Sequence, residues 1–290
     1  MIHTIQSDQL IVSINEFGAE LDSIACKKSK KEYLWQADPK HWDKKAPVLF
    51  PIVARLKDEK YNYNGKEYHL PIHGFADQSL FTTSGPDTDG SSITFSLESS
   101  EETLKVYPFK FKFNVVYEVT NNCLKTTYNV ENKTDGLMYF SCGSHEGFAI
   151  DKLEDYYLEF DKDAHYQSLK FSERGLYEDG LITVIDCGRR YPLTFDLFEK
   201  NDSIAFANVP SKKITLASDK NNTKIIVDYT NVPNVVIWTR KNAPYICIEP
   251  WDGLPDPEAD YGDFSKKPGI ITLQKNETYD FVHRITITEG

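Results

Sequence analysis

The residue best suited to acid–base chemistry in this sequence is Glu249, in an apolar and aromatic stretch near the C-terminus. Ile246 and Ile248 alternate with their neighbours there, as in a β-strand that buries one face. Successive side chains of a strand point to opposite faces, so the other face would present Glu249, with Tyr245 and Trp251 near it. A carboxylate beside aromatic rings is typical of a sugar site. The alternative is a solvated carboxylate at a strand end.

Pro250 decides where Glu249 lies in its strand. Proline has no N–H to donate to a neighbouring strand, so it is rare in the middle of a sheet. We therefore expect the strand to end at Glu249. The carboxylate would then lie at the rim of a sheet, where a small molecule can enter.

Two histidines and an arginine are further candidates for the same site. His73 precedes Gly74, which allows a close approach of the backbone, and His145 stands among small residues that leave its imidazole open to a cavity. Arg55 lies near the end of an apolar segment, 47–56, whose two prolines predict an irregular, buried path. A guanidinium against apolar walls needs acceptors, such as sugar hydroxyls or a carboxylate. The alternatives are a structural ion pair for Arg55 and a structural hydrogen bond for His73.

Two aspartates could supply further acceptors for hydroxyl groups. Asp202 begins a strand-like run, and Asp196 stands in a short apolar and aromatic segment before it. For each of them, the alternative is a role as a turn or strand-cap residue.

The elements that must position these residues are predicted to be β-strands. Apolar residues occupy every second position over 109–119 and 124–130, and Asn121 and Asn122 predict a turn between the two runs. No sustained period of 3.6 residues is present; segment 153–160 comes closest and could also be an edge strand. Shorter runs with a period of two occur at 10–14, 93–97, 214–216, 225–229, 235–237 and 281–287. Many strands separated by turns predict an all-β fold, a large sandwich or barrel, which we expect to form one domain over residues 1–290.

The composition limits the partners. The chain has 44 Asp and Glu against 33 Lys and Arg, a formal charge of −11 that repels polyanions, so neither nucleic acid nor an anionic membrane is expected as a partner. There is no apolar run of about 18 residues and no signal-peptide pattern, so we expect a soluble, cytoplasmic protein. The five cysteines form no C-x-x-C pair, which indicates reduced thiols and no metal site.

Taken together, these segments resemble the aldose 1-epimerase (galactose mutarotase) superfamily, and most closely its LacX-like bacterial branch. The resemblance implies a single large antiparallel β-sandwich, the galactose mutarotase-like supersandwich, with a sugar cleft on a concave face and no metal or organic cofactor. The motifs that carry it span most of the chain in order: LFPIVARL (49–56), HGFA (73–76), YPF (107–109), GSH (143–145) with Phe148, DLF (196–198) with Asp202, and CIEPWDG (247–253).

The resemblance also implies a role for each candidate residue. Glu249 would be the general base and His145 the general acid: the base takes the proton of the C1 hydroxyl while the acid protonates the ring oxygen. The ring then opens, and rotation about C1–C2 followed by reclosure gives the other anomer. A histidine with a pKa near its usual value is only partly protonated at neutral pH, and a carboxylate, Glu249 or Asp202, could raise the pKa of His145. The sugar would be held by Arg55, His73, Asp202 (or Asp196 in its place) and an aromatic ring, Trp251 or Tyr245.

Two positions depart from the family pattern. Asp77 follows the HGFA motif where many relatives have a basic residue that helps to hold phosphate, which disfavours a phosphorylated sugar. Glu146 follows His145 where proline is common, and it could reshape that loop or change the pKa of the histidine.

The sequence therefore predicts an isomerase, an aldose 1-epimerase that interconverts the anomers of a free hexose such as galactose or glucose, as a monomer or homodimer. The alternatives are a non-catalytic sugar-binding or sensing protein and a hexose-6-phosphate 1-epimerase. A glycoside hydrolase that pairs Glu249 with Asp202 is a further alternative, and it needs the two carboxyl groups roughly 5–10 Å apart.

Overall fold

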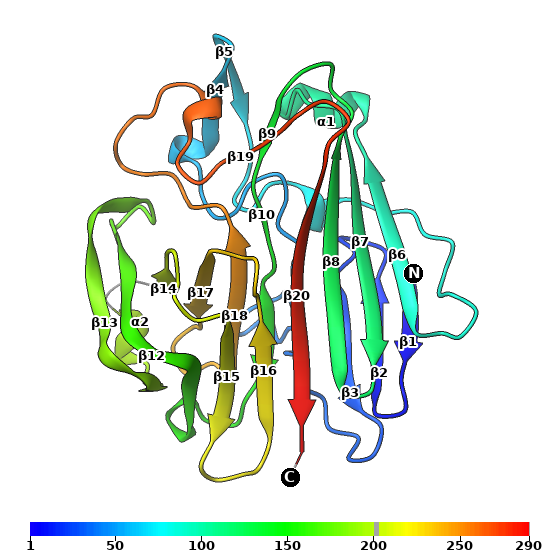
Figure 1. The fold of residues 1–290 in the computed structure, drawn as a ribbon, viewed down its shortest axis with the longest axis vertical. Helices are drawn as coiled ribbons and strands as arrows, with labels where there is room; N and C mark the ends of the chain where they lie inside the picture. The colour runs from blue at the N-terminus through cyan, green and yellow to red at the C-terminus, as the bar shows by residue number, and fades with distance from the viewer. Residues whose placement is uncertain (200–202, 290) are drawn as a thin grey trace.

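The architecture is a β-sandwich built on one curved antiparallel sheet of 13 strands, seen in the computed structural model of Figure 1. Residues 1–199 and 203–289 are described. The strands lie in the order β10, β18, β17, β14, β12, β15, β16, β20, β8, β7 and β6, with β11 beside β18 and β13 beside β12. Their bounds are β6 (Ser92–Glu98), β7 (Phe111–Thr120), β8 (Cys123–Asn132), β10 (Cys142–Gly143), β11 (Glu146–Ala149), β12 (Tyr156–Phe171), β13 (Tyr177–Pro192), β14 (Ser203–Phe206), β15 (Lys213–Ser218), β16 (Lys224–Asp228), β17 (Asn234–Trp238), β18 (Tyr245–Asp252) and β20 (Thr278–Thr288).

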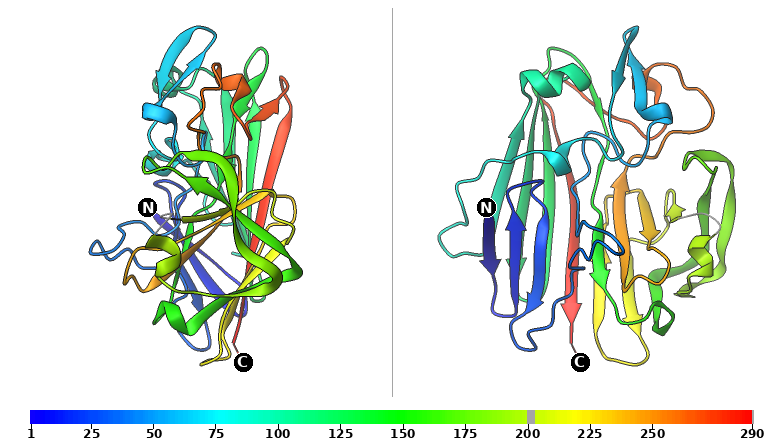
Figure 2. Two further views of the ribbon diagram at one scale, coloured as in Figure 1. Left: turned by 90° about the vertical axis from the view of Figure 1, so that its left-hand side faces the viewer. Right: turned by 180° about the vertical axis from the view of Figure 1, so that it is seen from behind.

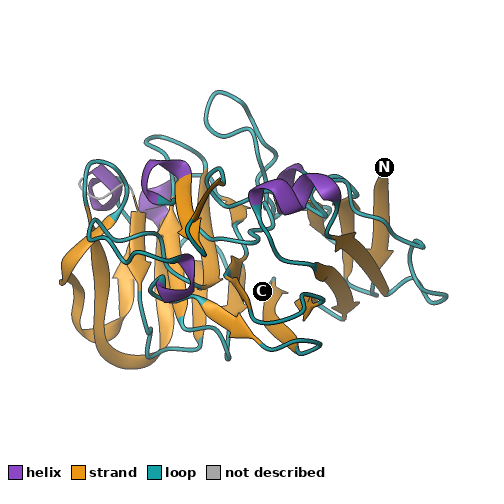
Figure 3. Ribbon diagram, turned by 90° about the horizontal axis from the view of Figure 1, so that it is seen from above, coloured by secondary structure: helices purple, strands orange, loops and turns teal. Residues whose placement is uncertain are grey.

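Smaller elements complete the fold. The three-stranded sheet β1–β3 lies behind β6–β8, as Figure 2 shows, and helices are few and short (Figure 3). Within the described residues, no helix combines the length and the apolar character needed to cross a membrane. The bounds are β1 (Ile2–Gln6), β2 (Leu10–Asn15), β3 (Leu21–Cys26), β4 (Lys60–Tyr63), β5 (Lys66–His69), β9 (Met138–Phe140), β19 (Ile271–Leu273), α1 (Glu101–Val106), α2 (Asp196–Glu199), and the 3-10 turns Lys57–Glu59, Ala76–Gln78, Leu153–Asp155 and Phe264–Lys266.

The period-two segments form strands, as predicted, and the all-β prediction is confirmed. The β7–β8 hairpin pairs Val119 with Leu124 across the Asn121–Asn122 turn, and every second residue of both strands is buried. Burial of each large apolar side chain contributes roughly 1.5–3 kcal/mol, which explains why this pattern fixes the register.

Two elements go beyond the prediction, which left segment 153–160 open between a helix and an edge strand and named no helix at 101–106. Segment 153–160 begins as a 3-10 turn and then enters β12, which pairs with β13 in a hairpin of two 16-residue strands. Helix α1 is capped by Ser100, whose hydroxyl accepts a hydrogen bond from the Thr103 N–H. With six residues, α1 is too short to show a helical period.

The prediction that the strand ends at Glu249 is wrong, because β18 continues to Asp252. The Pro250 carbonyl accepts a hydrogen bond from the Ser144 N–H at 3.0 Å. In an antiparallel sheet, the backbone nitrogen and carbonyl of one residue point toward the same neighbouring strand. The nitrogen of Pro250, which carries no hydrogen, therefore points to the interruption between β10 and β11. Proline is therefore tolerated here in the interior of the sheet.

A buried ion pair holds the segment that carries Arg55. The Lys267 ammonium lies 2.8 Å from the Asp256 carboxylate, with side chains only 1% and 2% exposed. The Asp256 N–H donates to the Arg55 carbonyl, and its carboxylate accepts from the Lys57 N–H, both at 2.9 Å. Burial lowers the pKa of Lys267, and attraction to Asp256 opposes this shift.

We expect Asp256→Ala to lower the free energy of unfolding by about 3–5 kcal/mol, because it leaves the Lys267 charge buried without a partner. Guanidinium denaturation measures this loss. The matched control is Asp135→Ala, which removes an exposed pair with Lys275 and should change stability little. Adding Lys267→Met to Asp256→Ala should recover part of the loss; a double variant no more stable than Asp256→Ala would contradict the account.

Candidate functional site

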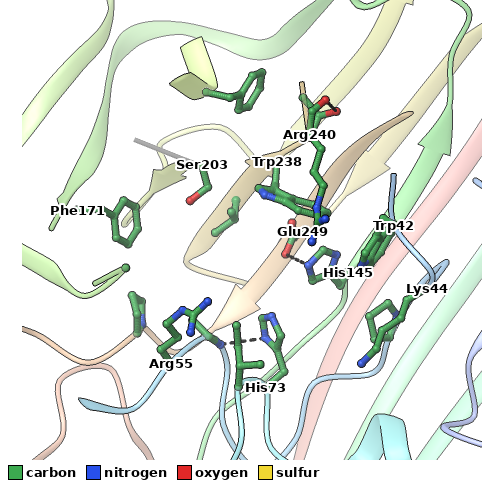
Figure 4. A pocket seen from close by; sticks show the side chains of 18 of the residues that line it. Trp42, Lys44, Arg55, His73, His145, Phe171, Ser203, Trp238, Arg240 and Glu249 are labelled. Carbon is green, nitrogen blue, oxygen red and sulfur yellow. Dashed lines mark hydrogen bonds and ion pairs between the residues drawn. The ribbon is translucent and has the colours of Figure 1, made fainter. Parts of the chain in front are cut away.

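A cavity of about 1110 Å³ lies over strands β17 and β18, on the face opposite the main core. Its volume is slightly above the roughly 300–1,000 Å³ typical of small-molecule sites. Five of the six residues that the sequence predicted for a site line it together: Arg55, His73, His145, Glu249 and Trp251. Figure 4 labels the first four of them.

Glu249 and His145 meet on the floor of this cavity. Ile246 and Ile248 of β18 pack into the main core, as predicted, so Glu249 faces the cavity from the other side of the strand. His145 lies in the interruption between β10 and β11, both of which pair with β18. The interruption lets its imidazole turn toward Glu249, and Nε2 lies 3.3 Å from Oε2.

Burial sets the protonation of this pair. Glu249 is 1% exposed, and its carboxylate oxygens and His145 Nδ1 have no hydrogen-bond partner among the described residues. Burial, followed by the negative charge of Glu146, raises the pKa of Glu249 well above its usual value. Burial lowers the pKa of His145 to about 4, although Glu146 opposes this shift. The net shift is therefore opposite to the one that a nearby carboxylate could produce, because desolvation of the ring outweighs the attraction.

His73 is held in one neutral form. Gly74 has φ +80°, and a Cβ there would lie 2.4 Å from the Phe50 carbonyl oxygen, so the predicted close approach of backbone is confirmed. The Ala54 N–H donates to His73 Nδ1 at 3.0 Å. The ring proton must therefore be on Nε2, and burial lowers the pKa of His73 well below its usual value. His73 can thus donate one hydrogen bond through Nε2.

Three tryptophans give the cavity aromatic walls. Trp42 and Trp238 flank His145, with ring centroids 5.0 and 5.6 Å from the imidazole, and Trp251 lies 5.8 Å from His73. Tyr245 is fully buried and does not line the cavity. Trp42 and Trp238 were not predicted from the sequence. Trp238 could have been found, because it lies two residues after Val236 on the same strand and therefore on the same face, and Val236 pairs with Glu249. Trp42 lies in an irregular segment.

Cations surround the cavity of this acidic protein. Arg55 and Arg240 line it, and neither guanidinium has an ion-pair partner among the described residues. In Figure 4, Arg240 extends toward His145 and Glu249, while Arg55 lies on the side of His73. Lys44 also lines the cavity but forms an ion pair with Asp77, which is buried outside the lining. The charge of Asp77 is thus offset by a cation, and its predicted effect against a phosphorylated sugar stays a prediction.

The remaining carboxylates do not complete the site as described. Asp202 lies outside the described residues, so its predicted contact with sugar hydroxyls, and the hydrolase alternative that depends on it, stay predictions. Asp196 is exposed and does not line the cavity. Glu146 turns away and pairs with His283 at 2.8 Å, both buried. Burial opposes ionisation of Glu146, but the attraction and hydrogen bond of His283 keep its pKa below the usual value.

Comparison with known proteins gives the family context. A family model described as aldose 1-epimerase matches residues 1–286. Protein LacX (plasmid) from Lactococcus lactis subsp. lactis is 30% identical over 297 residues, which cover 98% of this chain and 98% of that protein.

Solved structures agree with this match. A galactose mutarotase related enzyme from Lactobacillus acidophilus is 35% identical, with a TM-score of 0.94 over 100% of this chain and 98% of that chain. A galactose mutarotase-like protein from Lactobacillus casei is 31% identical, with a TM-score of 0.93 over 99% of this chain and 100% of that chain. The predicted galactose mutarotase-like fold is therefore confirmed.

The hydrogen bond to His73 Nδ1 leads to a spectroscopic prediction. Long-range ¹H–¹⁵N NMR of the imidazole should show the Nε2–H tautomer and a ring that remains neutral at pH 5.5. An unperturbed histidine, with a pKa of about 6.5, would be mostly protonated there. The His73→Gln variant assigns the signal, and a doubly protonated ring at pH 5.5 would contradict this geometry.

Proposed function

The chain belongs to the aldose 1-epimerase family, and on this premise we propose that it is a mutarotase that interconverts the α and β anomers of a hexose such as galactose or glucose. The observation that carries the proposal is the contact of His145 Nε2 with Glu249 Oε2, 3.3 Å apart on the cavity floor. Anomer exchange needs one group to take a proton and another to give one.

In the proposed mechanism, Glu249 accepts the proton of the C1 hydroxyl while His145 donates a proton to the ring oxygen, and the ring opens to the aldehyde. The two groups have then exchanged protonation states. After rotation about C1–C2, His145 takes the proton back from the hydroxyl that attacks C1, and Glu249 protonates the carbonyl oxygen. The pair carries one proton before and after the cycle, so the enzyme returns to its starting state.

The pKa shifts of Glu249 and His145 fit this scheme. With the pKa of Glu249 raised and that of His145 lowered, the shared proton rests on Glu249. A sugar hydroxyl that donates to Glu249 favours its ionised form. The proton can then move to His145, which gives the base and acid that ring opening requires.

The other cavity residues would hold the sugar. Arg55 and the Nε2–H of His73 are donors for ring hydroxyls, and Trp251 offers an aromatic face for the apolar side of the ring. Asp202 remains a proposed acceptor for hydroxyl groups.

Polarimetry of freshly dissolved α-glucose and α-galactose tests the proposal. The protein should accelerate the approach to anomeric equilibrium, and Glu249→Gln and His145→Asn should each reduce kcat by about 10²- to 10⁴-fold, because each removes one proton-transfer group. Asp196→Asn, which alters an exposed carboxylate outside the cavity lining, is the matched control and should leave the rate unchanged. Sugar binding without acceleration would favour the sensing alternative instead.

A phosphorylated hexose is a second candidate substrate, favoured by the guanidiniums of Arg55 and Arg240 in the cavity lining, which form no ion pair with any residue that the structure describes. Arginine binds phosphate through paired charge-assisted hydrogen bonds. The ion pair with Lys44 offsets the charge of Asp77, which weakens the electrostatic objection to a phosphate group.

Arg240→Gln distinguishes the two substrate classes. If the natural substrate carries phosphate, the variant should lower kcat/KM for glucose 6-phosphate by about 10- to 100-fold, the equivalent of losing one charged hydrogen bond of about 1.5–3 kcal/mol. The effect on glucose should be much smaller. Arg190→Gln is the control, because Arg190 pairs with Asp219 away from the cavity. Equal effects on both sugars would argue for the free hexose.

A further inference from the structure

Cys247 lies beside the proposed catalytic pair, although ring opening makes no use of a thiol. It stands two residues before Glu249 on β18 and therefore on the same face of the strand. A nitrogen of His145, the Cys247 sulfur and a carboxylate oxygen of Glu249 all lie within 4.8 Å of one another. Within residues 1–199 and 203–289, this is the one group of three such side chains close enough to hold a metal ion.

We propose that His145, Cys247 and Glu249 form a Zn²⁺ site on the cavity floor, and that bound metal inhibits the enzyme. A tetrahedral Zn²⁺ with bonds of about 2.0–2.3 Å places its ligand atoms roughly 3.3–3.7 Å apart. The 3.3 Å from His145 Nε2 to Glu249 Oε2 already matches one edge of such a site. Because the three ligand atoms lie within 4.8 Å of one another, the sulfur must close a gap of up to roughly 1.5 Å to complete the face.

Unsatisfied polar atoms point to the same site. His145 is 8%, Cys247 0% and Glu249 1% exposed, and the two Glu249 oxygens have no hydrogen-bond partner among the described residues. Burying such groups without partners costs free energy that a coordinated cation would recover.

The donor set selects the metal. One sulfur, one nitrogen and one oxygen suit a borderline-soft ion such as Zn²⁺, whereas Mg²⁺ and Ca²⁺ prefer oxygen ligands alone. Three protein ligands leave a fourth position, which would open to the cavity because His145 and Glu249 both line it. Metal there would compete with the C1 hydroxyl for Glu249. Inhibition therefore rests on the proposed function, whereas metal binding does not.

Co²⁺ titration of the whole protein tests metal binding without any sugar. The wild type should give the ultraviolet charge-transfer band of a Co²⁺–thiolate bond, and Zn²⁺ should abolish it by displacement. Cys247→Ser and Cys247→Ala should lack the band, while Cys142→Ala, which removes another fully buried thiol, should keep it. No band in the wild type, or a band that persists without Cys247, would overturn the site.

Mutarotation with added Zn²⁺ tests the consequence. Zn²⁺ should slow the wild type, with relief by EDTA and by high sugar concentration. With each protein compared with its own metal-free rate, Cys247→Ser should need at least about tenfold more Zn²⁺ for half inhibition, since even outer-shell changes cost a metal site 10- to 100-fold. Equal Zn²⁺ sensitivity of the two proteins overturns the role of the thiolate. A Co²⁺ band with no inhibition by Zn²⁺ would overturn the inhibitory role while leaving the site itself in place.

Discussion

Burial of the Glu249 carboxyl group without a hydrogen-bond partner among the described residues is the constraint on which the rest of the site depends. An ionised carboxylate there is costly, so the proton of the Glu249–His145 pair stays on the carboxyl group until a ligand supplies donors. The sheet maintains this state: β18 fixes Glu249, and the interruption between β10 and β11 places His145 against it. The Glu249–His145 pair is thus preorganised for proton transfer while carrying little net charge of its own.

Much of the fold and several site residues could be predicted from the sequence because they follow local rules. The period of two gave the β7–β8 hairpin, and the same alternation placed Glu249 on the face opposite Ile246 and Ile248. Burial of one face of a strand determines both results. His73 and Arg55 were identified from their motifs, and the structure brings both to the cavity.

Other features depend on contacts between distant segments, which a local pattern does not contain. Pro250 is tolerated inside β18 only because the neighbouring strand is interrupted beside it. Trp42 and Arg240 reach the cavity from irregular or turn segments. The pKa of His145 falls because the folded chain removes water from the ring. The size of this effect relative to the attraction of nearby carboxylates depends on where the fold places those carboxylates, which the sequence does not give.

The central claim is that Glu249 and His145 act as one proton-transfer unit, and a double-variant cycle tests it most directly. Magnetisation-exchange NMR measures the rate of anomer exchange at equilibrium in the wild type, Glu249→Gln, His145→Asn and the double variant. Groups that act as a unit are strongly non-additive, so the double variant should be no slower than the slower single variant. Losses that multiply in the double variant, or a wild type that does not accelerate exchange, would contradict the account.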